Sequence, residues 1–135
     1  MASSPTVRVI YADTDQMGIV YYGNYLRYFE IGRIEWLRSR GHNYKDFEAQ
    51  GVLLPVIEAH ASYRAPARYD DLLTVEARLV EARRVSVRFA YRVTREDGLL
   101  IAEGYTVHAA VGRDGRPRRL PPELAELLGR EVVAP

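Results

Sequence analysis

The sequence predicts an α+β protein in which one long helix near the start is wrapped by an antiparallel sheet. Two observations support this fold class. Apolar residues recur at helical spacing between residues 24 and 39, and from residue 73 onward they alternate with polar residues in three long stretches. The length of 135 residues suits a single domain over 1–135, and 47% hydrophobic residues suffice for a packed core.

Helical spacing predicts one long helix from Asn24 to Ser39. Its apolar stripe follows three- and four-residue steps through Tyr22, Tyr25, Phe29, Gly32 and Trp36, and is widened by Leu26, Ile34 and Leu37. A stripe this wide predicts burial on most sides, so we expect this helix at the centre of the fold. Asn24 is the expected capping residue by type, and Gly41 suits the end of the helix.

Alternation with a period of two predicts the strands. Strands are expected at 6–12, 52–63, 73–79, 85–94 and 101–111, and short helices at 43–50 and 123–128. Asp97-Gly98 predicts a tight hairpin turn between the last two strands. The last long strand is rich in small residues, including Gly104, which suits a surface that lies close to the helix.

Composition excludes several classes of partner and site. The formal net charge is +1, from 19 basic and 18 acidic residues, so nucleic acid and membrane surfaces are not expected as partners. Cysteine is absent, which excludes disulfides and cysteine-based metal sites or nucleophiles. No apolar stretch approaches the length of a membrane span, and the first residues lack the pattern of a signal peptide. We therefore expect a cytoplasmic protein without a membrane span.

The stretch from Tyr11 to Arg33 carries the most information about function. It reads Asp-Thr-Asp-x-x-Gly-Ile-Val-Tyr-Tyr-x-Asn-Tyr and then Phe-Glu-x-x-Arg, which strongly resembles the hotdog-fold acyl-CoA thioesterases of the 4-hydroxybenzoyl-CoA type. The dense match covers residues 9–33, and the later strand pattern agrees through Val111. The resemblance implies a hotdog fold, hydrolysis of a CoA thioester, and a homodimer or homotetramer with active sites at the subunit interface.

Asp15 is the main candidate for a catalytic residue. It lies in a tight turn before a helix start, where backbone N–H groups carry a partial positive charge and could polarise a thioester carbonyl. Its carboxylate could activate water as a general base or attack the carbonyl to form an anhydride, and both routes stay open. A purely structural role, in which Asp15 only holds the loop, is the alternative. Asp13 is expected to be structural, with its side chain bonded to the backbone of the turn.

The resemblance makes Tyr22 the second catalytic candidate, because the backbone N–H at this position is expected to bind the thioester carbonyl. The Tol–Pal-associated acyl-CoA thioesterases that resemble this chain carry His here, whereas the 4-hydroxybenzoyl-CoA enzymes carry Tyr. A plain core tyrosine is the alternative. The adjacent Gly23 is placed in the substrate-binding set, and Val56 and Ile57 are candidates for the acyl pocket, with core packing as their alternative.

The phosphates of coenzyme A suggest a role for paired arginines, because the guanidinium fork suits phosphate oxygens. The candidate clamps are Arg83 with Arg84 and Arg118 with Arg119. Solvated surface positions are the alternative for both pairs.

No metal and no cofactor are expected, apart from the coenzyme A that belongs to the substrate. Asp13, Asp15 and Gly18 imitate a calcium loop, but Met17 and Asn24 stand where oxygen ligands are required. The three histidines His42, His60 and His108 show no metal spacing, and the last two are expected to be satisfied strand residues. The competing functions are a non-catalytic acyl-CoA-binding hotdog protein and a hotdog dehydratase.

Overall fold

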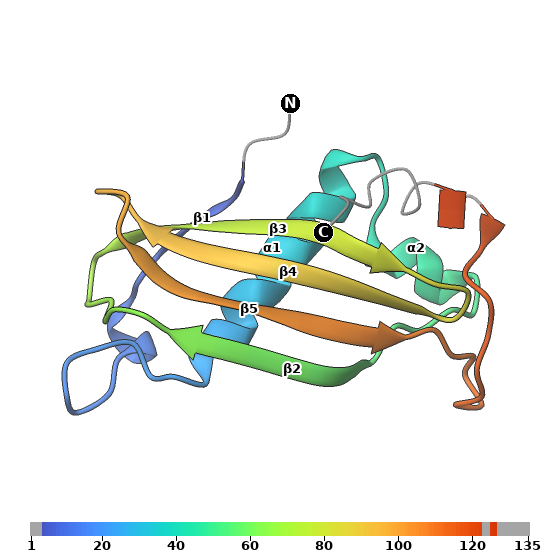
Figure 1. Cartoon of the computed structure of the whole chain (residues 1–135), viewed down its shortest axis with the longest axis horizontal. Coiled ribbons are helices and arrows are strands. Elements are labelled where there is room, and N and C mark those ends of the chain that lie inside the picture. The colour runs from blue at the N-terminus through green and yellow to red at the C-terminus, as the bar shows by residue number, and fades with distance from the viewer. Residues whose placement is uncertain (1–3, 123–124, 127–135) are drawn as a thin grey trace.

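The protein, seen in a computed structural model that describes residues 4–122 and 125–126, is a five-stranded antiparallel sheet crossed by one long helix (Figure 1). The strand order is β1-β3-β4-β5-β2. In chain order the elements are β1 (Thr6–Arg8), the 3₁₀ turn η1 (Tyr11–Asp13), α1 (Asn24–Ser39), α2 (Tyr44–Ala49), β2 (Val56–Tyr63), β3 (Leu72–Ala82), β4 (Ser86–Arg95) and β5 (Leu100–Ala109). The predicted α+β arrangement is therefore confirmed.

Two predicted strands are each too long by four residues, and the strand predicted over 101–111 ends two residues early, at Ala109. The prediction of a strand over 6–12 is wrong beyond Arg8, because the chain then leaves the sheet to form η1, which carries Asp13 beneath α1. The prediction of a strand over 52–63 is wrong before Val56, because Pro55 has no N–H to donate to a ladder. The predicted terminal helix over 123–128 lies mostly outside the described residues.

Most of the predicted apolar stripe of α1 packs against the inner face of the sheet, but Leu26 is 44% exposed and only six residues of the helix are buried, so the prediction of burial on most sides is wrong. The Phe29 ring stacks on Tyr91, with centroids 4.4 Å apart and planes 3° apart, and Trp36 meets Phe89 edge-on at 5.4 Å. Gly32 lets the helix approach closely, because an added Cβ would lie 2.8 Å from Cγ1 of Val75. Burial of these rings removes several hundred Å² of apolar surface from water, which is the main force that holds α1 on the sheet.

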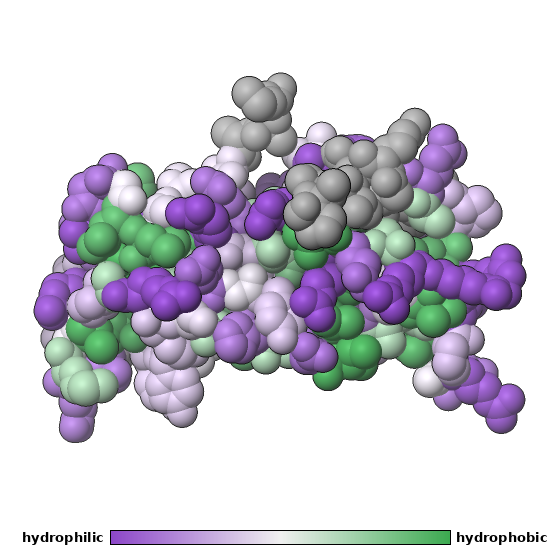
Figure 2. All heavy atoms as spheres, in the orientation of Figure 1, coloured by the Kyte–Doolittle hydropathy of each residue, from purple (hydrophilic) through white to green (hydrophobic). Residues whose placement is uncertain are grey.

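The outer face of the sheet carries charged and polar side chains (Figure 2). Arg92 stands opposite Glu103 in the register of β4 and β5, and the Arg88 guanidinium lies 4.4 Å from the centroid of the Tyr105 ring. The sheet therefore has one buried face, and cavities lie between it and α1 or at its ends. None of the helices within the described ranges is long and apolar enough to cross a membrane.

Strand β2 forms one edge of the sheet and is exposed along its first half. Residues 56–60 are all exposed, and within the described part of the chain only β5 pairs with this strand. An edge strand of this kind presents unpaired backbone N–H and C=O groups to a partner.

Candidate active site

Asp15 lies in a loop that its own backbone bonds hold tightly. The Asp15 N–H donates to the carbonyl of Ile19, and the Gly18 N–H donates to the carbonyl of Asp15, both at 2.9 Å. Gly18 has φ +79°, a left-handed conformation that favours glycine. Oδ1 of the Asp15 side chain accepts from the Met17 N–H at 2.9 Å. Among the described residues, Oδ2 has no partner, so one carboxylate oxygen is fixed and the other is available.

The half-buried Asp15 faces a cavity of about 460 Å³. The lining is mostly apolar and aromatic and consists of Asp15, Met17, Ile19, Val20, Tyr22, Tyr25, Tyr63, Arg64, Ala65 and Pro66. Arg64 is already paired with Glu103 at 3.0 Å. The cavity falls within the usual size and character of small-molecule sites, which are apolar with a few placed polar groups. Asp15 and Tyr22, the two catalytic candidates, thus line one cavity.

The N-terminus of α1 adjoins this cavity. The cap of the helix is Gly23, so the prediction of Asn24 as the cap is wrong: its side-chain amide instead donates to the carbonyl of Asp13 at 2.9 Å. Within residues 4–122 and 125–126, the N–H groups of Tyr22 and Gly23 have no acceptor. Free N–H groups at the start of a 16-residue helix form the kind of environment that stabilises negative charge on an oxygen.

Tyr22 is 61% exposed, so the prediction that it belongs to the buried stripe is wrong. The residue instead lines the cavity mouth, where its carbonyl accepts a hydrogen bond from the Tyr63 hydroxyl at 3.3 Å. Tyr25 and Phe29 are buried as predicted, although Tyr25 also lines the cavity. Burial raises the pKa of Tyr25 to about 12, so its hydroxyl is neutral at physiological pH.

Asp13 is structural, but by contacts other than those predicted. Its carboxylate is buried and accepts from Arg27 Nη2 at 2.5 Å and from the Tyr28 hydroxyl at 2.8 Å. The prediction that it bonds to the backbone of the turn is therefore wrong, because Asp15 makes that bond. Burial, followed by this hydrogen bond to Asp13, raises the pKa of Tyr28. Asp13 fastens the loop that carries Asp15 to the first turns of α1.

We expect Asp13→Ala to lower the free energy of unfolding by about 2–3 kcal/mol, because it leaves the buried Tyr28 hydroxyl without its charged acceptor. Urea unfolding of both proteins measures the change. Glu35→Ala is the control, since it removes an exposed ion pair with Arg38 and should cost at most about 1 kcal/mol. Equal losses for the two variants would contradict the structural role of Asp13.

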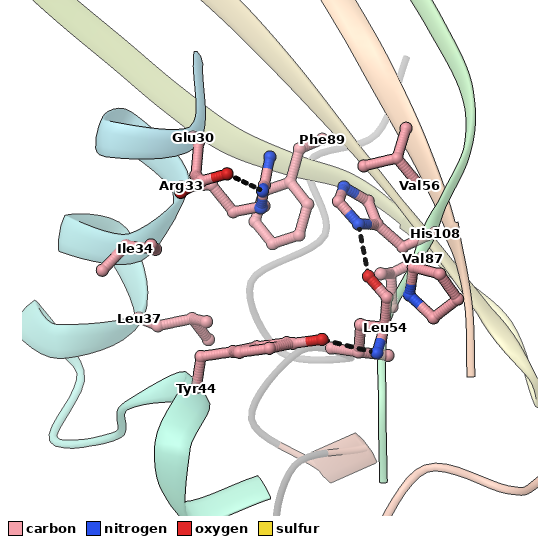
Figure 3. A pocket seen from close by; sticks show the side chains of 11 residues that line it. Glu30, Arg33, Ile34, Leu37, Tyr44, Leu54, Val56, Val87, Phe89 and His108 are labelled. Atoms are coloured by element: carbon pink, nitrogen blue, oxygen red, sulfur yellow. Dashed lines mark hydrogen bonds and ion pairs between the residues drawn. The ribbon is translucent and has the colours of Figure 1, made fainter. Parts of the chain in front are cut away.

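A second cavity of about 270 Å³ lies between α1 and the sheet, where the chain enters β2 (Figure 3). Its lining is Glu30, Arg33, Ile34, Leu37, Tyr44, Leu54, Pro55, Val56, Val87, Phe89 and His108. Of the two candidates for the acyl pocket, Val56 lines this cavity, while Ile57 is 63% exposed and lines neither cavity. Within one chain, the structure therefore does not bring Val56 or Ile57 to Asp15.

A chain of hydrogen bonds runs behind this second cavity. Arg33 Nη1 donates to the Tyr91 hydroxyl at 3.1 Å, and that hydroxyl lies 2.5 Å from Thr106 Oγ1. Thr106 Oγ1 is 2.8 Å from His108 Nε2, and His108 Nδ1 is 3.0 Å from the Leu54 carbonyl. The Leu54 carbonyl only accepts, so His108 Nδ1 carries a proton and donates to it. Burial lowers the pKa of His108 to about 4, so the ring is neutral at pH 7, and Nε2 then accepts from the Thr106 hydroxyl, which accepts from the Tyr91 hydroxyl.

The histidine predictions are confirmed for the two strand residues. His108 is buried and bonded on both ring nitrogens, and the exposed His60 lies 3.1 Å from the Ser62 hydroxyl. Burial, and then the positive charge of Arg33, lower the pKa of His108 to about 4 from 6.5.

We expect the depressed pKa of His108 to make the protein sensitive to acid. In the unfolded chain this group takes up a proton near pH 6.5, whereas the folded protein resists until about pH 4. Stability should therefore fall as the pH drops from 6.5 to 4, by about 3 kcal/mol in total. Urea unfolding at pH 7.5 and 4.5 tests this, with His108→Gln expected to lose less stability than wild type. The same acid-induced loss in both proteins would contradict it.

The arginine candidates for the CoA phosphates lie away from Asp15 in the same chain. Arg83 pairs with Glu81 at 2.8 Å in the β3–β4 hairpin, and Arg84 adjoins it. This hairpin is at the opposite end of the sheet from the Asp15 loop (Figure 1). Arg118 donates to the Gly51 carbonyl at 3.1 Å, which ties the chain after β5 to the end of α2.

Sequence reasoning missed several residues of these cavities. From the sequence, Tyr63 is only the end of a predicted strand and Arg33 is only part of a motif. The alternation within 85–94 and 101–111 indicates which residues face inward, and this face includes the polar groups of Tyr91 and Thr106. No sequence signal gives the strand register that places these two residues side by side.

Comparison with known proteins gives likenesses over most of the chain. The family described as the thioesterase-like superfamily matches residues 9–128. An acyl-CoA thioester hydrolase from Escherichia coli, YbgC, is 33% identical over 85% of this chain and 87% of its own. A 4-hydroxybenzoyl-CoA thioesterase from Pseudomonas sp. is 32% identical over 70% of this chain and 71% of its own. A solved structure of a hypothetical protein from Thermus thermophilus superimposes with a TM-score of 0.91 at 38% identity, covering 96% of this chain and 99% of that chain.

Proposed function

The chain belongs to the thioesterase-like superfamily and has the hotdog fold that the resemblance predicted, and we propose that it hydrolyses acyl- or aryl-CoA thioesters with Asp15 as the catalytic carboxylate. The products would be a free acid and coenzyme A. The observation that carries the role of Asp15 is its position: its carboxylate faces an apolar cavity beside the start of α1, and one carboxylate oxygen and the N–H groups of Tyr22 and Gly23 have no partner among the described residues.

In the proposed reaction, the thioester carbonyl oxygen accepts hydrogen bonds from the Tyr22 or Gly23 N–H. Negative charge that develops on this oxygen is stabilised there, an effect typically worth about 10²–10³ in rate for one such donor. Asp15 then takes a proton from water as the water attacks the carbonyl carbon, and the thiolate of coenzyme A leaves. The covalent alternative starts with attack by Asp15 itself, which gives an anhydride that water hydrolyses. A single turnover in H₂¹⁸O tests the covalent route, because anhydride hydrolysis at the aspartyl carbon would place ¹⁸O in Asp15, whereas direct attack of water on the thioester places it only in the product acid.

We propose that two copies pair along their β2 edges. In an antiparallel pair whose two-fold axis passes between Ala59 and His60, Val56 of one copy faces Tyr63 of the second copy. Val56 lines the second cavity and Tyr63 lines the Asp15 cavity, so this register joins the two cavities across the interface. The β3–β4 hairpin with Arg83 and Arg84 lies at the same end of the sheet as Val56 (Figure 1). A homodimer would thus bring Val56, Arg83 and Arg84 of one copy toward Asp15 and Tyr22 of the other, whereas Ile57 lines neither cavity. A homotetramer and a cytoplasmic location stay predictions.

A thiol-release assay with short, long and aromatic acyl-CoAs tests the proposed function. We expect turnover of at least one class, and light scattering after gel filtration should give a mass of two or four chains. Tight acyl-CoA binding without thiol release would instead indicate the non-catalytic binding protein. A dehydratase is disfavoured because, among the described residues of one chain, no histidine lines the Asp15 cavity, and both ring nitrogens of His108 in the second cavity are already hydrogen-bonded.

A further inference from the structure

Arg33 is an unusual feature of the second cavity. Its side chain is only 16% exposed, and it lies in a wall that is otherwise mostly aliphatic and aromatic (Figure 3). Among the described residues its hydrogen-bond partner is the neutral Tyr91 hydroxyl, and Glu30 Oε1 is 3.8 Å from Nη2, beyond hydrogen-bond distance. A guanidinium has five N–H donors, so most of its capacity is unused and is accessible from the cavity.

The other polar groups of the cavity do not compete for these donors. The Leu54 carbonyl is taken by His108, the Leu54 N–H is taken by the Tyr44 hydroxyl at 2.7 Å, and His108 carries no charge. The remaining counter-charge is Glu30, whose side chain is 60% exposed and can turn toward solvent. The cavity therefore combines apolar walls with one cation that is only partly neutralised.

The size and the charge of the second cavity together define which ligands fit it. A volume of about 270 Å³ is at the small end for ligand sites, which suits an apolar body of the size of a phenyl ring or a seven-carbon chain. A carboxylate matches the planar fork of a guanidinium with two parallel hydrogen bonds, which a hydroxyl cannot do. A carboxylate would also avoid the other cavity, where Asp15 repels it.

We propose that this cavity is a binding site for a carboxylate carried on a small apolar body, with Arg33 as the residue that binds the carboxylate. Binding of the carboxylate needs no catalysis, but both sources of the acid rest on the proposed function. The acid has two chemical sources: the free acid that hydrolysis would release, or a second carboxyl group at the far end of an acyl chain.

Binding to the wild-type protein tests the proposal without any substitution. Isothermal titration with octanoate and benzoate should give at least tenfold tighter binding than with octanol and benzyl alcohol, because a charge-assisted pair is lost with the alcohols. In two-dimensional NMR spectra, octanoate should shift the amide signals of Leu54, Phe89 and His108. Equal affinity for acid and alcohol, or shifts confined to Ile19, Tyr22 and Tyr63, would overturn the proposal.

Two substitutions on α1 should change this affinity in opposite directions. Arg33→Gln should weaken octanoate binding by about tenfold or more. Glu30→Gln should strengthen it by about two- to fivefold, because it removes a partly exposed negative charge next to the guanidinium. Arg38→Gln is the matched control, an exposed arginine on the same helix, and should leave the affinity unchanged. If Arg33→Gln does not fold, unchanged or weaker binding by Glu30→Gln still contradicts the proposal.

Turnover measurements distinguish the two possible sources of the acid. If the carboxylate belongs to the acyl chain, adipoyl-CoA should show a lower KM than hexanoyl-CoA, and Arg33→Gln should remove the difference. If it is the released product, octanoate should inhibit wild type more than Arg33→Gln, with equal KM for both substrates. Loss of all turnover would refute the proposed function alone, since the binding measurements need no catalysis.

Discussion

Asp15→Asn should lower the turnover of acyl-CoA by about 10²–10⁴-fold and leave acyl-CoA binding within about threefold of wild type. Asparagine keeps the size of the side chain and can still accept the hydrogen bond from the Met17 N–H, so the loop should keep its shape. It can neither take a proton from water nor attack a carbonyl carbon. The substitution therefore removes the proposed chemistry and little else.

Thiol release measures the turnover of this variant, and titration with a substrate measures its binding. Glu96→Gln is the control, because it removes an exposed carboxylate in the β4–β5 hairpin and should not change the rate. Turnover by Asp15→Asn within about twofold of wild type would show that Asp15 only holds its loop, which is the alternative that the sequence left open.

Gly104→Ala should destabilise the protein by about 3 kcal/mol or more, or prevent folding. Gly104 lies in β5 opposite Ala61 of β2, and an added Cβ would overlap the His60 carbonyl oxygen and lie 3.0 Å from Cε2 of Phe29. The first atom is backbone in a paired strand and the second belongs to a buried ring, so neither can move without disturbing the fold. Overpacking of this kind typically costs 1–3 kcal/mol, and more where the neighbour is rigid.

Urea unfolding and the yield of soluble protein measure the effect of Gly104→Ala. Gly98→Ala is a suitable control: no atom lies within 4 Å of its added Cβ, and only the left-handed φ of +87° opposes the substitution. The control should cost about 1 kcal/mol. A comparable loss for both variants would show that β2 can move away from β5 without a large penalty.

Periodicity alone was sufficient to predict most of the secondary structure. The bounds of α1, 24 to 39, were predicted correctly, because the three- and four-residue steps end at a glycine in a left-handed conformation, Gly41. The hairpin at Asp97-Gly98 and the close approach of the helix to the strand at Gly104 were also predicted. These features depend on neighbours in the sequence or on a single steric requirement, both of which can be read from one chain.

Predictions that depended on residues far apart in the sequence were less successful. Asp13 and Asp15 are two positions apart and of the same type, yet one is buried against Arg27 and Tyr28 and the other faces a cavity. Their sequence patterns do not differ in a way that reveals this. The contacts that separate them come from α1, after the chain has turned away from β1.

The sequence by itself determined the fold class, the long helix and the motif that holds Asp15. Only the tertiary structure decided that Tyr22 lies at a cavity mouth, that Val56 belongs to a second cavity, and that Arg33, Tyr91, Thr106 and His108 form one hydrogen-bonded chain. The physical reason is that helical and strand periods specify which face of an element is buried. They do not specify which residues of another element meet that face, because strand register and the crossing of α1 over the sheet are set by packing of the whole chain.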